Sequence, residues 1–375
     1  MALVVVDPRF GAELRRHREQ CGFTLRKLAQ RVNCSHTYLW ELETGRKRPG
    51  GADIARLLDD ALGAGGQLAA LVTEHAADAD PEVEARVAYV AGRPARLDRA
   101  AVAALRTILA QQRRLDDAIG AAPLIAPTMT HIDMVRRALA EAHGDLRTAL
   151  LDLAAQWVQF AAWLHMAAGR YADADALLDQ ACTWAVETGD YEMLATVLSY
   201  KGHRAWLARD VGDLIGLTEA SLRDPRAYVG QRAYDYFQLA RGYALAGDRA
   251  ATDEALRIGV DLAAEALEYR GDPPPWHYYR TSAFYRLEHG LALQVGGRDG
   301  EAIEHLTAGL SELEPEARRA EWVGDYLVHL GMAYHATGDG ERAAATTAEA
   351  TEIAEATQST RLGRRVADLG RRVGL

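Results

Sequence analysis

A short pattern recurs five times between residues 162 and 350 and constrains the fold of most of the chain. Each copy has a glycine followed by Asp or Arg, at Gly169, Gly212, Gly247, Gly297 and Gly338. Small residues stand seven positions earlier, at Ala162, Ala205, Ala240, Gly290 and Gly331. Twelve positions later stand Ala181, Asp224, Gly259, Gly309 and Ala350, so only the Gly212 copy departs there. Small residues at fixed intervals let paired helices approach closely, and the pattern therefore predicts stacked helix pairs.

This pattern resembles the tetratricopeptide repeat, in which helix-turn-helix units stack into a solenoid. The marker glycines are separated by 43, 35, 50 and 41 residues, compared with about 34 in the ideal repeat. The helices or loops are therefore expected to be longer than consensus. The widest gap contains the segment from Gly271 to Trp276 with three prolines, which must leave the helix.

The composition agrees with helix throughout and sets a broad class. Ala, Leu, Arg and Glu are plentiful, and Asn33 is the single asparagine in the sequence. The length of 375 residues is enough for two or three domains. The early apolar run from Leu3 to Val6 is too short for a signal peptide or membrane span, so we expect a cytoplasmic protein. The three cysteines form no CxxC pair; reduced packing residues are the favoured interpretation, and redox sensing is the alternative.

The N-terminal region has a different periodicity from the repeats. Residues 8–72 predict five short helices, over 10–21, 25–32, 36–44, 53–62 and 67–74. Thr24 and Ser35 are natural N-caps for the second and third, and Gly22 and Gly45 are stops after the first and third. The second and third helices, joined by a short turn, form the signature of a DNA-binding helix-turn-helix.

The details of this segment resemble the Xre/lambda-repressor-like family. The resemblance rests on Leu28-Ala29, Ser35, Leu39, Leu42-Glu43-Thr44-Gly45 and the basic run that ends at Pro49. Residues 9–48 also carry ten Lys/Arg and four Asp/Glu, in a chain whose formal net charge is −10. A basic head on an acidic body favours nucleic-acid contact through the head, although a solvated charged face is the simpler explanation for charge alone.

The resemblance implies that the third helix enters the major groove of double-stranded DNA. Base readers would then be His36, Thr37, Glu41 and Trp40, and phosphate contacts would come from Arg26, Lys27, Ser35, Tyr38, Arg46, Lys47 and Arg48. For Tyr38 and Trp40, packing against the first helix is an equal alternative. Leu25 stands where many family members have Gln, so Arg26 or Lys27 would replace its contacts.

We therefore expect an all-α protein with three regions. Residues 1–75 form the helix-turn-helix domain, 76–147 a linker with connecting helices, and 148–375 a tetratricopeptide-like solenoid. This arrangement resembles actinobacterial Xre-type regulators with tetratricopeptide-like C-terminal regions. Positions counted from the small residue of each repeat predict a concave face made of Gln156, Gln159, Trp163, Ser199, Trp206, Arg209, Tyr234, Phe237, Arg241, Phe284, Gln294 and His335.

The resulting prediction is a transcription regulator that acts as a homodimer on an inverted-repeat operator. The concave residues suit a small-molecule or peptide effector. The body contains no Asn side chain that could hold a peptide backbone, so a metabolite is the preferred class of effector. Alternatively, about half of the aromatic residues on this face pack between helices. A DNA-associated adaptor that binds a partner protein is the rival function. No HExxH, P-loop or GxSxG motif occurs, so we expect no catalytic residue, cofactor or metal, and Asp325 and His329 are interpreted as an ordinary helical pair.

Overall fold

The computed structural model describes residues 3–7, 9–32, 34–47, 49, 52–75 and 99–374. The chain divides into two compact units, Met1–Ala85 and Arg86–Leu375. The predicted all-α class is confirmed in both, with one small sheet in the first unit. Among the helices of these residues, none combines the length and apolar content needed to cross a lipid bilayer.

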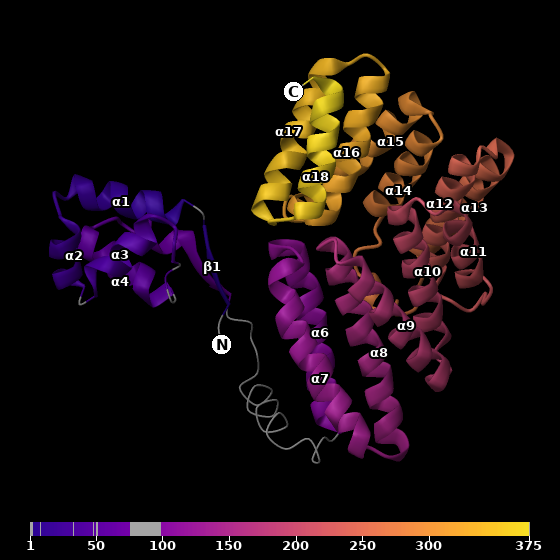
Figure 1. Ribbon diagram of the computed structural model, residues 1–375, viewed down its shortest axis with the longest axis horizontal. Coiled ribbons are helices and arrows are strands. Elements are labelled where there is room, and N and C mark those ends of the chain that lie inside the picture. Colours follow the sequence, from indigo (N-terminus) through magenta and orange to yellow (C-terminus); the bar gives the residue numbers. More distant parts are fainter. Residues whose placement is uncertain are drawn as a thin grey trace. The chain divides into compact units, whose positions relative to one another are not determined.

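The N-terminal unit is a small helical domain closed by two strands (Figure 1). Its helices are α1 (Phe10–Gln20), α2 (Leu25–Arg31), α3 (His36–Glu43) and α4 (Ala52–Leu62), and β1 (Leu3–Val6) pairs antiparallel with β2 (Val72–His75). Buried leucines from the helices form its core, including Leu14, Leu28, Leu39 and Leu58. Thr24 and Ser35 accept hydrogen bonds from the backbone N–H groups of Lys27 and Tyr38, which confirms both predicted N-caps.

The predicted fifth helix over 67–74 is wrong. A single 3-10 turn, η1 (Ala69–Leu71), occupies part of this range, and the chain then extends into β2. The Asp59 carboxylate holds the turn, because it accepts hydrogen bonds from the N–H groups of Gly66, Leu68 and Ala69 at 2.7, 2.7 and 3.0 Å. The valine run 4–6 then provides a strand partner, so pairing between distant segments overrides the local helical pattern.

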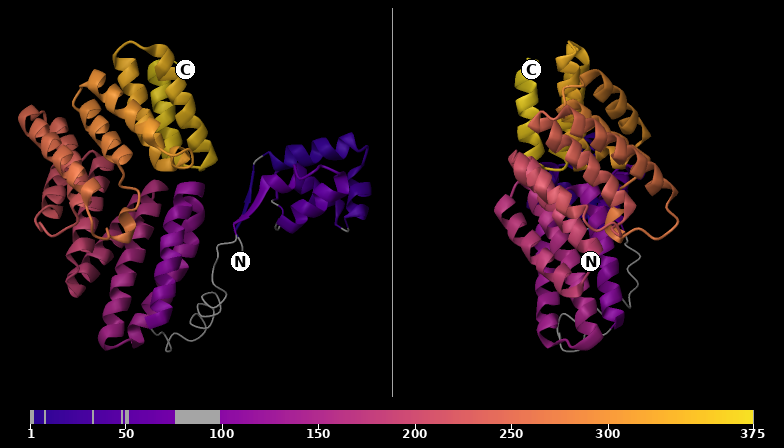
Figure 2. Two further views of the ribbon diagram at one scale, coloured as in Figure 1. Left: turned by 180° about the vertical axis from the view of Figure 1, so that it is seen from behind. Right: turned by 90° about the vertical axis from the view of Figure 1, so that its right-hand side faces the viewer.

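The C-terminal unit consists of consecutive antiparallel helix pairs (Figures 1 and 2). It begins with α6 (Arg99–Ile119), η3 (Ala122–Leu124) and α7 (Ile125–Glu141). The repeat pairs are α8 (Gly144–Ala167) with α9 (Tyr171–Thr188), α10 (Tyr191–Ala208) with α11 (Val211–Ser221), α12 (Val229–Ala246) with α13 (Arg249–Glu268), α14 (Ser282–Val295) with α15 (Asp299–Glu312), and α16 (Glu321–Ala336) with α17 (Gly340–Ala356). The 3-10 turns η4 (Pro275–His277) and η5 (Ala317–Arg319) lie in connections, and α18 (Thr360–Val373) ends the stack. The predicted tetratricopeptide-like pairing is thus confirmed.

Four marker glycines occupy the turns between paired helices. Gly169, Gly247, Gly297 and Gly338 have φ angles of 73°, 77°, 72° and 83°, which favour glycine over other residues. The fifth marker is wrong, because Gly212 lies inside α11. Its turn is formed three residues earlier, where Arg209 adopts φ 59° and Asp210 caps α11. The sequence pattern missed this turn because a non-glycine residue occupies the left-handed position.

Shifting this repeat by three residues brings it into agreement with the others. Gly202 and Ser221 then take the two small positions that had been assigned to Ala205 and Asp224. A Cβ atom at Gly202 would lie 2.6 Å from Thr218 Oγ1, so the position requires glycine for the close approach of α10 and α11. Ser221 is 2% exposed. All five repeats therefore have small residues at both crossing points.

A buried polar network joins α10, α11 and α12. Asp235 is fully buried on α12 and accepts hydrogen bonds from the Ser199 and Ser221 hydroxyls, both at 2.6 Å. The Gln231 amide also donates to this carboxylate at 2.9 Å. Burial nevertheless outweighs these hydrogen bonds and raises the pKa of Asp235 from 3.8 to about 6. Ser199, one of the predicted concave residues, therefore has a structural role between helices.

Candidate functional site

The recognition surface of the N-terminal unit lies on α3. The Ser35 cap starts this helix, and the buried Leu39 and Leu42 fix which side faces the core. His36 and Thr37 are exposed in the first turn, and among the described residues no side-chain hydrogen bond engages them. The two side chains at the N-terminal end of α3 are therefore free to meet another molecule, as expected for base readers.

The loop after α3 folds back over the same helix. The Arg46 guanidinium lies over the Trp40 ring at 4.6 Å, and Lys47 Nζ lies 5.3 Å from the centre of the Tyr38 ring. Lys47 also lies 3.8 Å from the Glu41 carboxylate. Trp40 is 39% exposed, so it is a surface residue stacked on a cation and does not belong to the core.

The remaining predicted phosphate-binding residues lie around α2 and its junction with α3. Arg26, Lys27 and Ser35 are exposed, and Lys27 Nζ lies 5.0 Å from the centre of the Phe23 ring. Arg48 lies outside the described residues. The exposed cations Arg26, Lys27, Arg46 and Lys47 thus flank the free N-terminal end of α3 in sequence, and they suit an anionic backbone.

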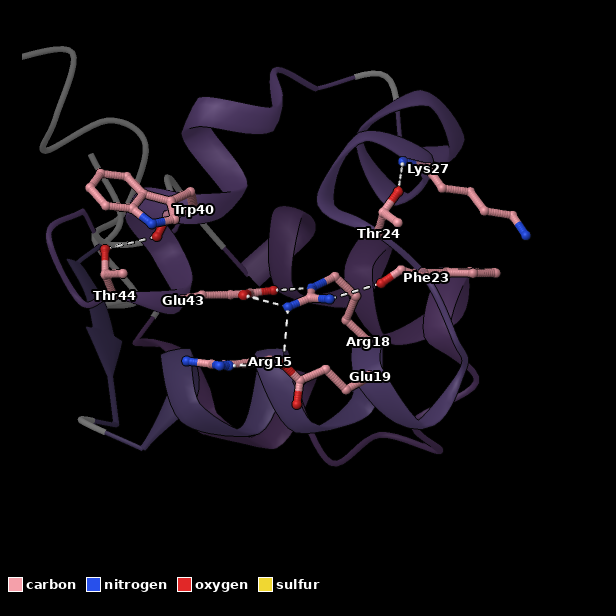
Figure 3. Close-up of polar contacts among 9 residues, drawn as sticks. All are labelled: Arg15, Arg18, Glu19, Phe23, Thr24, Lys27, Trp40, Glu43 and Thr44. Atoms are coloured by element: carbon pink, nitrogen blue, oxygen red, sulfur yellow. Dashed lines mark hydrogen bonds and ion pairs between the residues drawn. The ribbon is translucent and has the colours of Figure 1, made fainter.

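An ion pair that the sequence did not reveal holds α3 against α1 (Figure 3). Arg18 Nε and Nη2 donate to the two Glu43 carboxylate oxygens at 2.5 and 2.9 Å, and Nη1 donates to the Phe23 carbonyl oxygen at 2.8 Å. The side chains of Arg18 and Glu43 are only 11% and 5% exposed. Glu43 was recognised only as part of the family pattern, and its position gave no indication of its partner on α1.

The second candidate site is a cavity within the C-terminal unit. It contains about 1190 Å³ of space unfilled by protein atoms, including its opening, and α6, α8, α10, α12, α14, α16 and α18 all contribute to its wall. Four of the seven tryptophans line it, Trp163, Trp206, Trp276 and Trp322, together with five tyrosines. A hollow of this size with so aromatic a lining has the character of a ligand site.

Helix α6 contacts two later parts of this unit, the 275–280 segment and the end of α17. The Tyr278 hydroxyl donates to the Asp117 carboxylate at 2.6 Å and to the Arg113 carbonyl oxygen at 2.9 Å, which ties the 275–280 segment to α6. Gly120, at the end of α6, approaches the end of α17 so closely that a Cβ atom would lie 2.8 Å from the Thr357 carbonyl oxygen. The stack of repeats therefore curves back toward its own beginning.

The structure places about half of the predicted concave residues in this cavity. Gln159, Trp163, Trp206, Tyr234, Arg241 and Phe284 line it. The others lie elsewhere: Gln156 is buried and bonded to Asp152, Arg209 forms the α10–α11 turn, Phe237 packs in the core, Gln294 bonds to His329, and His335 is exposed.

The difference has a geometric reason in the phase of each helix. Residues two positions before the small residue line the cavity in four repeats, as Phe160, Tyr200, Glu288 and His329. One of the positions predicted from the sequence stands one residue earlier. It gave Gln159, which reaches the cavity, and Phe237, which packs in the core. One residue rotates the side chain by about 100° around a helix, enough to move it from the cavity wall into the core. The off-register second repeat also hid His203.

At the α16–α18 side of the cavity, the charges are paired. Arg361 contacts Glu321 at 2.6 Å and Asp325 at 2.8 Å, and Arg365 bonds to Asp325 and to His329 Nε2. Although burial opposes it, the two guanidinium groups hold the pKa of Asp325 below its usual range. Burial together with Arg365 lowers the pKa of His329 well below its usual range, so this ring is neutral. Asp325 and His329 thus serve an ion-pair network, and the described residues contain no group of three or more His, Cys, Asp or Glu arranged to hold a metal.

A second buried pair lies deeper in the wall. Arg241 Nη2 is 3.3 Å from Glu288 Oε2, and both residues are almost fully buried. The Tyr326 hydroxyl donates to the other Glu288 oxygen at 2.5 Å. Burial lowers the pKa of His203 to about 3, with Arg241 adding to the effect, so this lining histidine is also neutral.

The α6 side of the cavity differs, because its acids have no cationic partner among the described residues. Asp116 accepts a hydrogen bond from Trp163 Nε1 at 2.6 Å, and Asp117 accepts one from Tyr278. Burial raises the pKa of Asp116 to about 8 and also raises that of Asp117. No local signal in the sequence placed these two residues in a cavity.

Comparison with known proteins agrees with the two-part architecture. Residues 9–72 match the family described as "Helix-turn-helix domain", and this segment is therefore a helix-turn-helix domain. The chain thus combines a helix-turn-helix domain with tetratricopeptide-like helical repeats. No curated protein matches the chain.

Solved structures were also among the matches. BtubC (BKLC) from P. vanneervenii is 17% identical, with 64% of this chain and 93% of that chain covered and a TM-score of 0.42. Bacillus thuringiensis PlcR in complex with the peptide PapR7 and DNA is 13% identical, with 96% of this chain and 99% of that chain covered and a TM-score of 0.30. The TPR2AB domain of yeast Sti1 in its pHSP90 complex is 14% identical, with 71% of this chain and 99% of that chain covered and a TM-score of 0.25.

Proposed function

We propose that this protein is a sequence-specific transcription regulator whose DNA affinity responds to a small molecule bound in the cavity of its repeats. The observation that carries the proposal is the coexistence of a free, exposed N-terminal end of α3 and a large aromatic cavity in one chain. His36 and Thr37 read base edges, while Arg46, Lys47 and Arg48 bind phosphates and add affinity with little sequence preference.

The proposed active form is a homodimer. Helix-turn-helix domains pair to read two half-sites about one helical turn apart, so the operator would be an inverted repeat. An effector changes DNA affinity only if it binds one dimer geometry better than another. The repeats would set that geometry, because their curvature depends on what fills the cavity between α6 and α18.

Selection of genomic DNA fragments by the purified protein tests this function, followed by gel-shift titration at two salt concentrations. We expect an enriched inverted repeat and binding that weakens with salt. The double variant Arg46→Ala/Arg48→Ala should bind more weakly to all sequences, with a salt slope reduced by about one for each phosphate-binding cation removed. Thr37→Ala should instead lose discrimination at one position of each half-site.

A matched control removes an exposed cation from the repeats. Arg249, on α13, is 85% exposed at its side chain, and Arg249→Ala should leave DNA binding unchanged. If the selection enriches no sequence and no shift occurs, with or without small-molecule extract, the regulator function is wrong and the rival adaptor function gains support.

A further inference from the structure

We propose that the cavity binds an organic cation, a protonated amine or a quaternary ammonium carried on an aromatic or apolar body, with the charged group held between Asp116 and Asp117. This inference rests on the proposed sensing role of the cavity and specifies the chemical class of its ligand. The observations that support it are the unpaired acids, the charges around them and the aromatic wall.

The two acids have acceptor capacity that the protein leaves open. Each accepts a hydrogen bond from an aromatic donor, Trp163 Nε1 for Asp116 and the Tyr278 hydroxyl for Asp117, both at 2.6 Å. Within residues 99–374, neither carboxylate forms an ion pair with Lys, Arg or His. A carboxylate offers about four lone-pair sites, so both can accept further hydrogen bonds from a ligand.

The electrostatic surroundings of Asp116 favour a positive ligand. The nearest charges acting on it are Asp117 and Glu321, which are both acidic, and burial disfavours its ionised form further. Asp117 is desolvated too and is attracted only by Arg114, which lies outside the cavity lining. Burial raises the pKa of Asp116 to about 8, so a cation that enters here offsets the desolvation of both acids and favours the ionised form of Asp116.

The guanidinium groups of the cavity wall each have at least one contact within the protein. Arg241 and Arg361 have the carboxylate partners described above. Arg280 donates to the Gly230 carbonyl oxygen at 2.7 Å and so points toward α12. Arg113 directs Nη2 toward the backbone of α8 and stacks over the Trp276 ring at 5.7 Å. Asp116 and Asp117 therefore remain the acids of the lining that have no ion-pair partner among the described residues.

Aromatic rings surround the acids. Trp163 contacts Asp116 and meets Tyr200 edge to face at 6.2 Å, and Trp322 bonds to Asp117 and meets Phe284 in the same way at 6.2 Å. Ring faces attract ammonium groups, and more strongly when the pair is desolvated. The same rings provide an apolar wall for the body of the ligand.

One further polar atom on the wall accepts no hydrogen bond. Glu288 is 3% exposed and lines the cavity, yet its Oε2 forms only the ion pair with Arg241 described above, without a hydrogen bond from any described residue. A buried acceptor of this kind is costly unless something donates to it.

The test uses the full-length protein without DNA and measures binding by calorimetry and by quenching of tryptophan fluorescence. The probes are phenethylamine, benzyltrimethylammonium, the neutral analogue 2-phenylethanol and the acidic analogue phenylacetate. We expect each cationic probe to bind with a stoichiometry of one molecule per chain. The neutral and acidic analogues should bind more weakly by a factor of about ten or more. Asp116→Asn and Asp117→Asn should each weaken cation binding about tenfold.

Two controls keep the result interpretable. Asp133→Asn removes a carboxylate that is 59% exposed on α7 and should leave the affinity unchanged. The melting temperature of Asp116→Asn should not fall, because Asn still accepts the Trp163 hydrogen bond and has no charge to desolvate. A loss of binding in this variant would therefore not reflect unfolding.

Three results would overturn the inference: equal binding of 2-phenylethanol and phenethylamine, tighter binding of phenylacetate, or no binding of either cation at millimolar concentration. Because the assay contains no DNA, its outcome is separate from that of the proposed function. Cation binding without any change in DNA affinity would leave the ligand class intact and refute only the regulatory coupling.

Discussion

The ion pair between Arg18 and Glu43 leads to a quantitative prediction for the helix-turn-helix domain. Glu43→Ala removes two hydrogen bonds, at 2.5 and 2.9 Å, from a guanidinium that is only 11% exposed. Breaking a buried pair on one side costs about 3–5 kcal/mol, because the remaining charge is desolvated and uncompensated. Arg18 keeps its bond to the Phe23 carbonyl oxygen and a second carboxylate partner, Glu19, at 3.4 Å, so we expect no more than the lower end, about 3 kcal/mol.

Hydrogen exchange followed by mass spectrometry measures this in the full-length chain, since peptides from residues 10–43 report on the N-terminal unit alone. A loss of about 3 kcal/mol corresponds to about 100-fold faster exchange by global opening. The exposed pair of Arg15 and Glu19, at 2.9 Å, provides the control, and Arg15→Ala should change little.

A double variant separates the effect of the stranded charge from that of the missing side-chain packing. Replacing both Arg18 and Glu43 by methionine removes the buried charges together and should restore much of the lost protection. If Glu43→Ala accelerates exchange less than about fivefold, the pair behaves as a surface ion pair and the proposed anchoring of α3 to α1 is incorrect.

Two further predictions concern the repeats. Because burial raises the pKa of Asp235 from 3.8 to about 6, the folded state binds this proton more tightly than the unfolded state, and Asp235 should contribute a fall of about 3 kcal/mol in the unfolding free energy as pH rises from 4 through 6. Asp116, whose pKa is also raised, adds to the fall, so urea titrations of Asp235→Asn should show a decrease that is smaller by about 3 kcal/mol; an unchanged decrease would mean that the assigned burial is wrong. Gly202→Ala should lower the melting temperature, because the added Cβ atom would lie 2.6 Å from Thr218 Oγ1. Gly212→Ala should leave the melting temperature unchanged or raise it, because the nearest atom to the added Cβ lies at 3.7 Å. If instead Gly212→Ala lowered the melting temperature more than Gly202→Ala, the register expected from the sequence pattern would be favoured.

Local signals in the sequence were sufficient for the helix-turn-helix domain. The N-caps Thr24 and Ser35 and the turn glycines Gly22 and Gly45 occur where their side-chain and backbone chemistry required. These features depend on contacts within a few residues, so a linear sequence displays them directly. The missing fifth helix shows the limit, because β2 exists only through its pairing with residues 3–6.

The all-α class, the helical pairing of the repeats and the exposed end of α3 could all be predicted without coordinates, since capping, periodicity and glycine turns are local properties. The pairing of Arg18 with Glu43 and the register of the second repeat required the folded chain. Folding also brings Asp116 and Asp117 of α6 to Trp163 and Tyr278, which lie 47 and 161 residues away. Such contacts depend on the summed curvature of all the repeats, and small rotations in each helix accumulate before the last helices meet the first.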